Sequence, residues 1–181
     1  MLELVIPGTE CFDETKSEFI YGEDVILRLE HSLYAIAMWE SKWKKPFLGA
    51  REKDQKTVEE FEDYVKCMTL NENPVDPIVY KSLRREDYEK IQAYMQDSMT
   101  ATWFREDPNQ RPSREIVTAE LVYYWMIALE IPFECQYWHF NRLMTLIRVA
   151  SIKNQPSKKQ SQTDTLKQYR AANLARRKPK F

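Results

Sequence analysis

The stretch VILRLEHSLYAIAMWESKW, residues 25–43, contains a change of hydrophobic period that decides the fold. Three apolar residues alternate along its first part: Val25, Leu27 and Leu29. A period of two is typical of a half-buried strand. Three large side chains then recur at the spacing of one helical face: Ile36, Trp39 and Trp43. With Ser32 as N-cap, the sequence predicts an α+β fold, mostly α, with a short antiparallel β layer over 1–32 and a helical bundle over 33–152.

Shorter signals predict the remaining elements. LELVI (2–6) and EFIYG (18–22) are expected to be further strands, and Pro46 is expected to stop the first helix. Thr57 and Glu60 have the spacing of a capping box. Four apolar residues form a stripe behind that box: Val58, Phe61, Val65 and Met68. NENPVDP (71–77) is predicted to be a loop, and 78–96 a short helical turn followed by a longer helix.

The most apolar stretch, residues 121–149, is predicted to form a helical hairpin. Its first helix is expected to start at Arg114, with Ser113 as cap. Residues 121–129 lack a polar face, so this arm, including Trp125, is expected to lie in the core. Pro132 predicts a bend. The second arm is amphipathic, and its apolar side is expected to face partly outward, toward a partner.

A membrane span is not expected in this stretch. The unbroken apolar run between Glu120 and Glu130 is nine residues long, whereas a span needs about 20.

Charge divides the chain of 181 residues into an acidic body and a basic tail. From Lys153 to the end there are nine Lys and Arg against one acid, so the tail carries +8 and residues 1–152 carry −9. We expect a single domain over 1–152 and a basic tail over 153–181 that is disordered or that orders on a partner. The acidic body argues against a nucleic-acid partner.

No combination of residues predicts catalysis, a metal site or a cofactor. Cys135 and His139 are four apart, but their apolar setting favours an inert thiol. The chain has only two histidines, and its three cysteines lack paired spacing. Three glycines cannot form a phosphate-binding loop. We therefore expect a protein that is not an enzyme.

Several blocks together resemble a family of small proteins of phages with long non-contractile tails. They are EHSLYAIAMWESKWKKPFL (30–48), YVKCMTL (64–70), MTATWF (99–104), REIVTAELVYYWMIALEIPFECQYWHFNRLMTLIRV (114–149) and AANLARRK (171–178). Members of the family are encoded near the tape-measure gene and are usually called tail assembly chaperones.

The resemblance implies a holdase that coats the apolar, helical tape-measure protein until the tail tube polymerises. The expected partners are the tape-measure or tail tube protein and further copies of the chain. The expected location is the host cytoplasm, with the protein absent from the mature virion. The resemblance defines no functional residues. From the sequence itself, the residues expected to contact partners are Trp39, Trp43, Tyr137, Phe140, Met144, Ile147, Arg176 and Arg177.

Two alternatives stay open beside this expectation. One is a structural neck or tail-completion subunit, and the other is a small regulator that binds a host protein. Detection of the chain in purified particles would distinguish the structural subunit from the chaperone.

Overall fold

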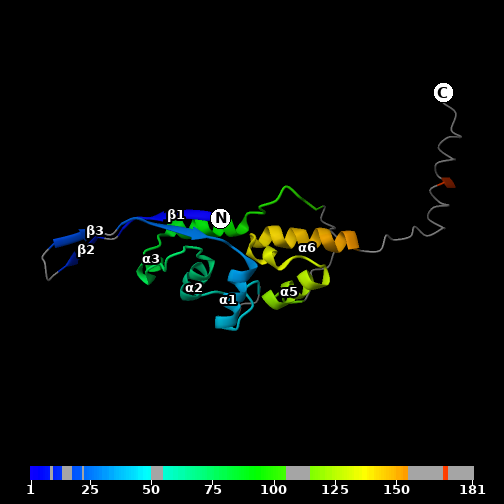
Figure 1. The fold of residues 1–181 in the computed structure, drawn as a ribbon, viewed down its shortest axis with the longest axis horizontal. Helices are drawn as coiled ribbons and strands as arrows, with labels where there is room; N and C mark the ends of the chain where they lie inside the picture. Colours follow the sequence, from blue (N-terminus) through cyan, green and yellow to red (C-terminus); the bar gives the residue numbers. More distant parts are fainter. Residues whose placement is uncertain are drawn as a thin grey trace, which may run out of the picture.

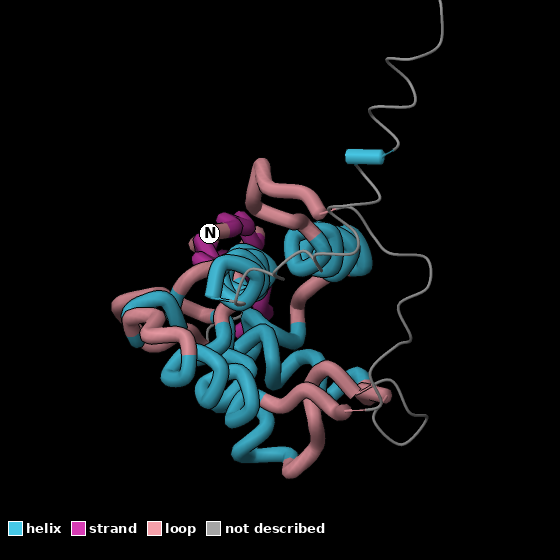
Figure 2. The backbone as a smooth tube through the Cα atoms, turned by 90° about the vertical axis from the view of Figure 1, so that its right-hand side faces the viewer, coloured by secondary structure: helices cyan, strands magenta, loops and turns pink. Residues whose placement is uncertain are grey.

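The computed structural model describes residues 1–8, 10–13, 18–21, 23–49, 55–104, 115–154 and 169–170. Figure 1 shows strands at the N-terminal end beside a body of helices, and Figure 2 shows the strands on one side of that body. The predicted α+β fold, mostly α, is confirmed. The elements are β1 (Leu2–Ile6), β2 (Glu10–Asp13), β3 (Glu18–Tyr21), β4 (Val25–Leu29), α1 (Leu33–Trp43), α2 (Val58–Met68), α3 (Pro77–Lys81), α4 (Arg85–Gln96), α5 (Ala119–Ala128), the 3-10 helix η2 (Phe133–Tyr137) and α6 (Phe140–Asn154).

The strands form two antiparallel pairs. β1 pairs with β4, so that Leu2 lies opposite Leu29, and β2 pairs with β3. The sequence did not predict β2, because its residues ECFD do not alternate between polar and apolar. β4 ends at Leu29 rather than at residue 32. The inward-facing side chains of the first pair are buried against the helices: Leu4, Ile6, Leu27 and Leu29.

Helix α1 follows β4 almost directly and occupies the centre of the body. Ser32 caps it as predicted, with its Oγ accepting a hydrogen bond from the Ala35 N–H at 3.2 Å. Trp39 is fully buried, and its Nε1 donates to the Glu60 carbonyl oxygen of α2 at 2.7 Å. The helix ends at Trp43, where Lys44 adopts a left-handed φ of 54° before Pro46 is reached.

Helix α2 begins with the predicted capping box. The Glu60 N–H donates to Thr57 Oγ1 at 3.2 Å, and the Thr57 N–H donates to Glu60 Oε2 at 2.8 Å. After α2 the chain runs beside β4, where the Leu70 N–H donates to the Arg28 carbonyl oxygen at 2.8 Å. The predicted short and longer helices over 78–96 are α3 and α4, and α4 contacts β1.

The C-terminal boundary differs slightly from the prediction. Helix α6 continues to Asn154, two residues into the predicted tail. The rest of that tail, with Arg176 and Arg177, lies outside the described residues except for a helical fragment at 169–170.

The two histidines meet in the core where β4 leads into α1. Their ring centroids are 5.3 Å apart. His31 Nδ1 hydrogen-bonds to the Tyr64 hydroxyl at 2.5 Å, and His139 Nε2 to the Tyr94 carbonyl oxygen at 3.0 Å. Burial, with smaller contributions from His139 and Lys56, lowers the pKa of His31 to about 3. Burial also lowers the pKa of His139, so both rings are neutral at pH 7.

Acidification from pH 7 to pH 5 should therefore destabilise the protein. In the unfolded chain His31 takes up a proton near pH 6.5, whereas in the folded chain it resists protonation down to about pH 3. The stability due to neutral His31 is complete above pH 6.5 and falls as the pH drops toward 3. At pH 5 the loss should be about 2 kcal/mol. Urea unfolding at the two pH values measures it, and His31→Gln should show a smaller drop because glutamine does not titrate. Equal drops in both proteins would contradict the account.

Candidate partner-binding surface

The start of α5 is fixed by two side chains. The Thr118 hydroxyl accepts a hydrogen bond from the Leu121 N–H at 3.4 Å. The Glu40 carboxylate of α1 accepts one from the Ala119 N–H at 2.8 Å and another from the Phe47 N–H at 2.6 Å. Burial raises the pKa of the Glu40 carboxyl, and the two N–H donors act against that rise.

The sequence prediction was wrong about the residue at which α5 begins. The helix begins at Ala119 rather than at Arg114, because Thr118 has extended backbone and its hydroxyl serves as the N-cap. The predicted cap, Ser113, lies outside the described residues.

Among the described residues, helix α5 is covered on one side only, which contradicts the expectation of a buried arm. Its buried residues are Ala119, Val122 and Met126. Tyr124 and Ile127 are 63% and 61% exposed, and Trp125 is half-buried rather than in the core. The helix packs on α1 at the edge of the bundle, so its lack of a polar face leaves apolar surface in contact with solvent.

The second arm is more deeply buried than expected. After Pro132 it starts as η2, and α6 follows. Phe140, Leu143 and Ile147 are at most 7% exposed. The Phe140 N–H donates to the His31 carbonyl oxygen at 2.6 Å, which holds the start of α6 against the core. The expectation that Phe140 faces a partner is therefore wrong.

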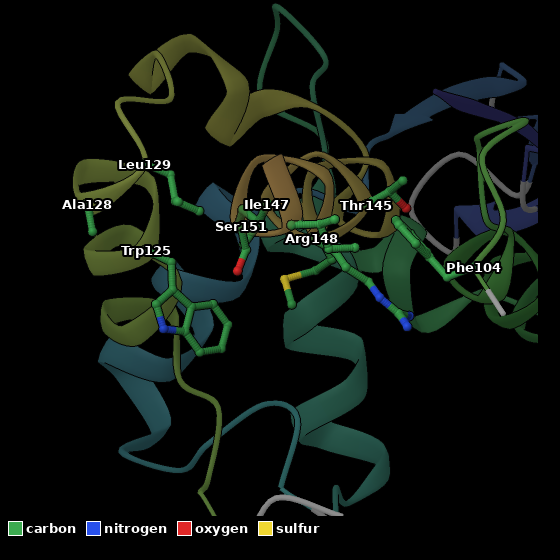
Figure 3. A pocket seen from close by; sticks show the side chains of 10 residues that line it. Phe104, Trp125, Ala128, Leu129, Thr145, Ile147, Arg148 and Ser151 are labelled. Atoms are coloured by element: carbon green, nitrogen blue, oxygen red, sulfur yellow. The ribbon is translucent and has the colours of Figure 1, made fainter. Parts of the chain in front are cut away.

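Between α5 and α6 lies an apolar groove of about 790 Å³, which we call the α5–α6 groove. In Figure 3 the indole of Trp125 projects from α5 toward the space beside α6, and Phe104 lies across from it. The lining residues are Phe104, Trp125, Ala128, Leu129, Met144, Thr145, Ile147, Arg148, Ser151 and Ile152. Those on α6 repeat at intervals of three and four residues, so they follow one side of the helix.

Among the residues that the structure describes, Arg148 is the one charged residue in this lining. Its guanidinium lies 4.1 Å from the centroid of the Phe104 ring. Among the residues that the structure describes, Arg148 forms no ion pair with a carboxylate. The groove thus has apolar walls and one cationic edge.

A second apolar area lies where α1, α5 and η2 meet. The rings of Tyr34 and Tyr137 are 5.4 Å apart, and those of Tyr123 and Phe133 are 6.3 Å apart. Tyr34, Phe133 and Tyr137 are each between 43% and 55% exposed. This aromatic area and the groove both include residues of α5.

The residues predicted to contact partners therefore separate into several environments. Met144 and Ile147 line the groove, although Ile147 is only 7% exposed, and Tyr137 belongs to the aromatic area. Trp39 is buried in the core, which excludes it from a surface. The half-buried Trp43 donates from Nε1 to Asp63 Oδ2 at 2.9 Å.

Sequence reasoning missed Phe104, Leu129 and Arg148 as lining residues. The absence of a polar face between residues 121 and 129 was a usable signal, because an apolar helix can be buried or can serve as a binding surface. Period alone does not distinguish these outcomes.

Both ring nitrogens of His139 bond to groups other than the Cys135 thiol. Burial raises the pKa of the Cys135 thiol. The ring nitrogens of His139 bond to the Tyr94 carbonyl oxygen and to the Asn141 N–H. Within the described ranges, no group of three or more His, Cys, Asp and Glu is placed to hold a metal ion. No described helix is long and apolar enough to cross a membrane.

Comparisons with protein-family models, with curated proteins and with solved structures find no match to this chain.

Because the two arms differ in burial, truncating a side chain in each arm should lower the free energy of unfolding by different amounts. Phe140→Ala should lower the free energy of unfolding by about 3–5 kcal/mol, because it leaves a cavity in the core. Ile127→Ala should change it by only about 0.5 kcal/mol, because Ile127 is mostly exposed. Urea unfolding of both variants tests this difference. A larger loss from Ile127→Ala would show that α5 is the buried arm.

Proposed function

We propose that this protein is a non-catalytic chaperone of phage tail assembly that binds apolar helices of the tape-measure protein. The observation that carries the proposal is the exposed apolar surface of α5 and the groove it forms with α6. Contiguous exposed apolar surface of this kind marks a site for another apolar chain.

The shape of the groove supports a helical target. Its walls are two helices, and a third helix can lie between them with side chains at i, i+3, i+4 and i+7 pointing into the groove. Met144 and Trp125 offer large apolar contacts there, and an unbranched methionine adapts to different target side chains. A repetitive helical target needs such adaptability more than a tightly shaped pocket.

The family resemblance of the sequence supports the identity of the target. A tape-measure protein is long, apolar and helical, so it must be kept from aggregating before the tube forms around it. A surface helix with no polar face is suited to this transient binding. The expected association with further copies of the chain stays a prediction.

Co-expression with the tape-measure protein of the same phage tests the proposal. The variant Ile152→Glu places a charge on the groove lining, whereas Ile78→Glu places the same charge on α3. The two isoleucines are matched in exposure, at 51% and 53%. We expect the unchanged chain and Ile78→Glu to keep the tape-measure protein in the soluble fraction. Ile152→Glu should lose this effect while its melting temperature stays close to that of Ile78→Glu.

Two results would contradict the proposal. One is a tape-measure protein that stays in the soluble fraction whether or not the chain is co-expressed with it. The other is a fixed number of copies of the chain in purified particles, measured by peptide mass spectrometry, which would indicate a structural subunit.

A further inference from the structure

Arg148 limits which helix can occupy the α5–α6 groove. Its guanidinium stacks on Phe104 at the edge of the groove, and Figure 3 shows it reaching from α6 toward that ring. A helix lying in the groove would cover this edge and remove water from the guanidinium. Covering a cation without a partner costs free energy, and no carboxylate among the described residues is in ion-pair contact with Arg148.

We propose that the groove selects amphipathic helices whose apolar stripe is bordered on one side by Asp or Glu, with one of these carboxylates pairing with Arg148. This inference rests on the proposed function, because it assumes that the groove binds a helix. An arginine can form two parallel hydrogen bonds with a carboxylate, which would fix the orientation of the helix as well as add affinity.

The other groups of the groove are consistent with this selection. Thr145 Oγ1 already donates to the Asn141 carbonyl oxygen at 2.9 Å, so it needs no partner from the target. The remaining lining side chains are apolar apart from Ser151. The target helix therefore needs apolar residues along its stripe and an acidic residue at one edge.

Charge argues against the chain's own tail as the occupant. From Lys153 onward the tail has nine Lys and Arg and one acid, so its cations would meet Arg148 at the groove edge. A separate acidic-edged helix avoids this repulsion.

Two synthetic 18-residue peptides test the proposal on the full chain. Both carry the same Leu and Ala stripe, bordered in one peptide by Glu and in the other by Lys. Binding is followed by tryptophan fluorescence, since Trp125 lines the groove, and by calorimetry. At low salt the Glu-bordered peptide should bind about tenfold more tightly than the Lys-bordered one. The difference should shrink at high salt.

Charge-reversal variants identify the responsible residue. Arg148→Glu should reverse the preference between the two peptides. Arg142→Glu is the matched control, because Arg142 is also on α6 and also stacks on a ring, that of Trp138 at 4.3 Å, but does not line the groove. This control should keep the preference of the unchanged chain.

Each failure has a distinct meaning. Equal binding of both peptides, unchanged in Arg148→Glu, would overturn the acidic-edge selection and leave the proposed function standing. Tighter binding of the Lys-bordered peptide would also overturn the selection. Binding of neither peptide would overturn helix binding by the groove itself. In that last case, sedimentation of the full chain would show whether a second copy covers the groove.

Discussion

Helix α1 holds both arms of the C-terminal hairpin, one from each of its ends. At its start, the His31 carbonyl oxygen accepts a hydrogen bond from the Phe140 N–H at the beginning of α6. In its last turns, the Glu40 carboxylate accepts one from the Ala119 N–H at the beginning of α5. Each bond satisfies an N–H group that a helix start leaves without an intrahelical partner. Because the Glu40 anchor holds α5 against α1, the opposite side of α5 is left uncovered by the part of the chain that the structure describes.

The exposed side of α5 carries the binding role that we propose. In most surface helices a polar face meets water, but here tyrosine, tryptophan and isoleucine take its place. Burying apolar surface stabilises a protein by roughly 25 cal/mol per Å², and apolar surface left in water lacks this favourable free energy. A partner helix in the α5–α6 groove would recover part of that free energy. The exposed side of α5 lies outside the core, whose buried residues come from β1, β4, η2 and the helices α1 to α6.

The sequence correctly predicted the helix starts that depend on hydrogen bonds between residues close together in the chain. Ser32 caps α1 and Thr57 forms a box with Glu60, and both interactions span three residues. The predicted burial of the hairpin was wrong at Trp125 and Phe140, because burial there depends on contacts between residues that are far apart in the chain. Glu40 and Ala119 are separated by 79 positions, and no period in the sequence connects them. Periodicity indicates which faces of a helix are apolar, whereas the tertiary anchors decide which faces are covered. The groove residues Phe104 and Arg148 were missed for the same reason.

Amide hydrogen exchange of the full chain, alone and with the tape-measure protein that we propose as its target, locates the binding surface. We expect slower exchange on binding in α5 and in α6 from Met144 to Ile152, where the groove residues lie. Exchange in α2 and α3 should stay unchanged. Protection confined to α2 and α3, with α5 exchanging at its original rate, would contradict the assignment of the exposed side of α5 as the binding surface.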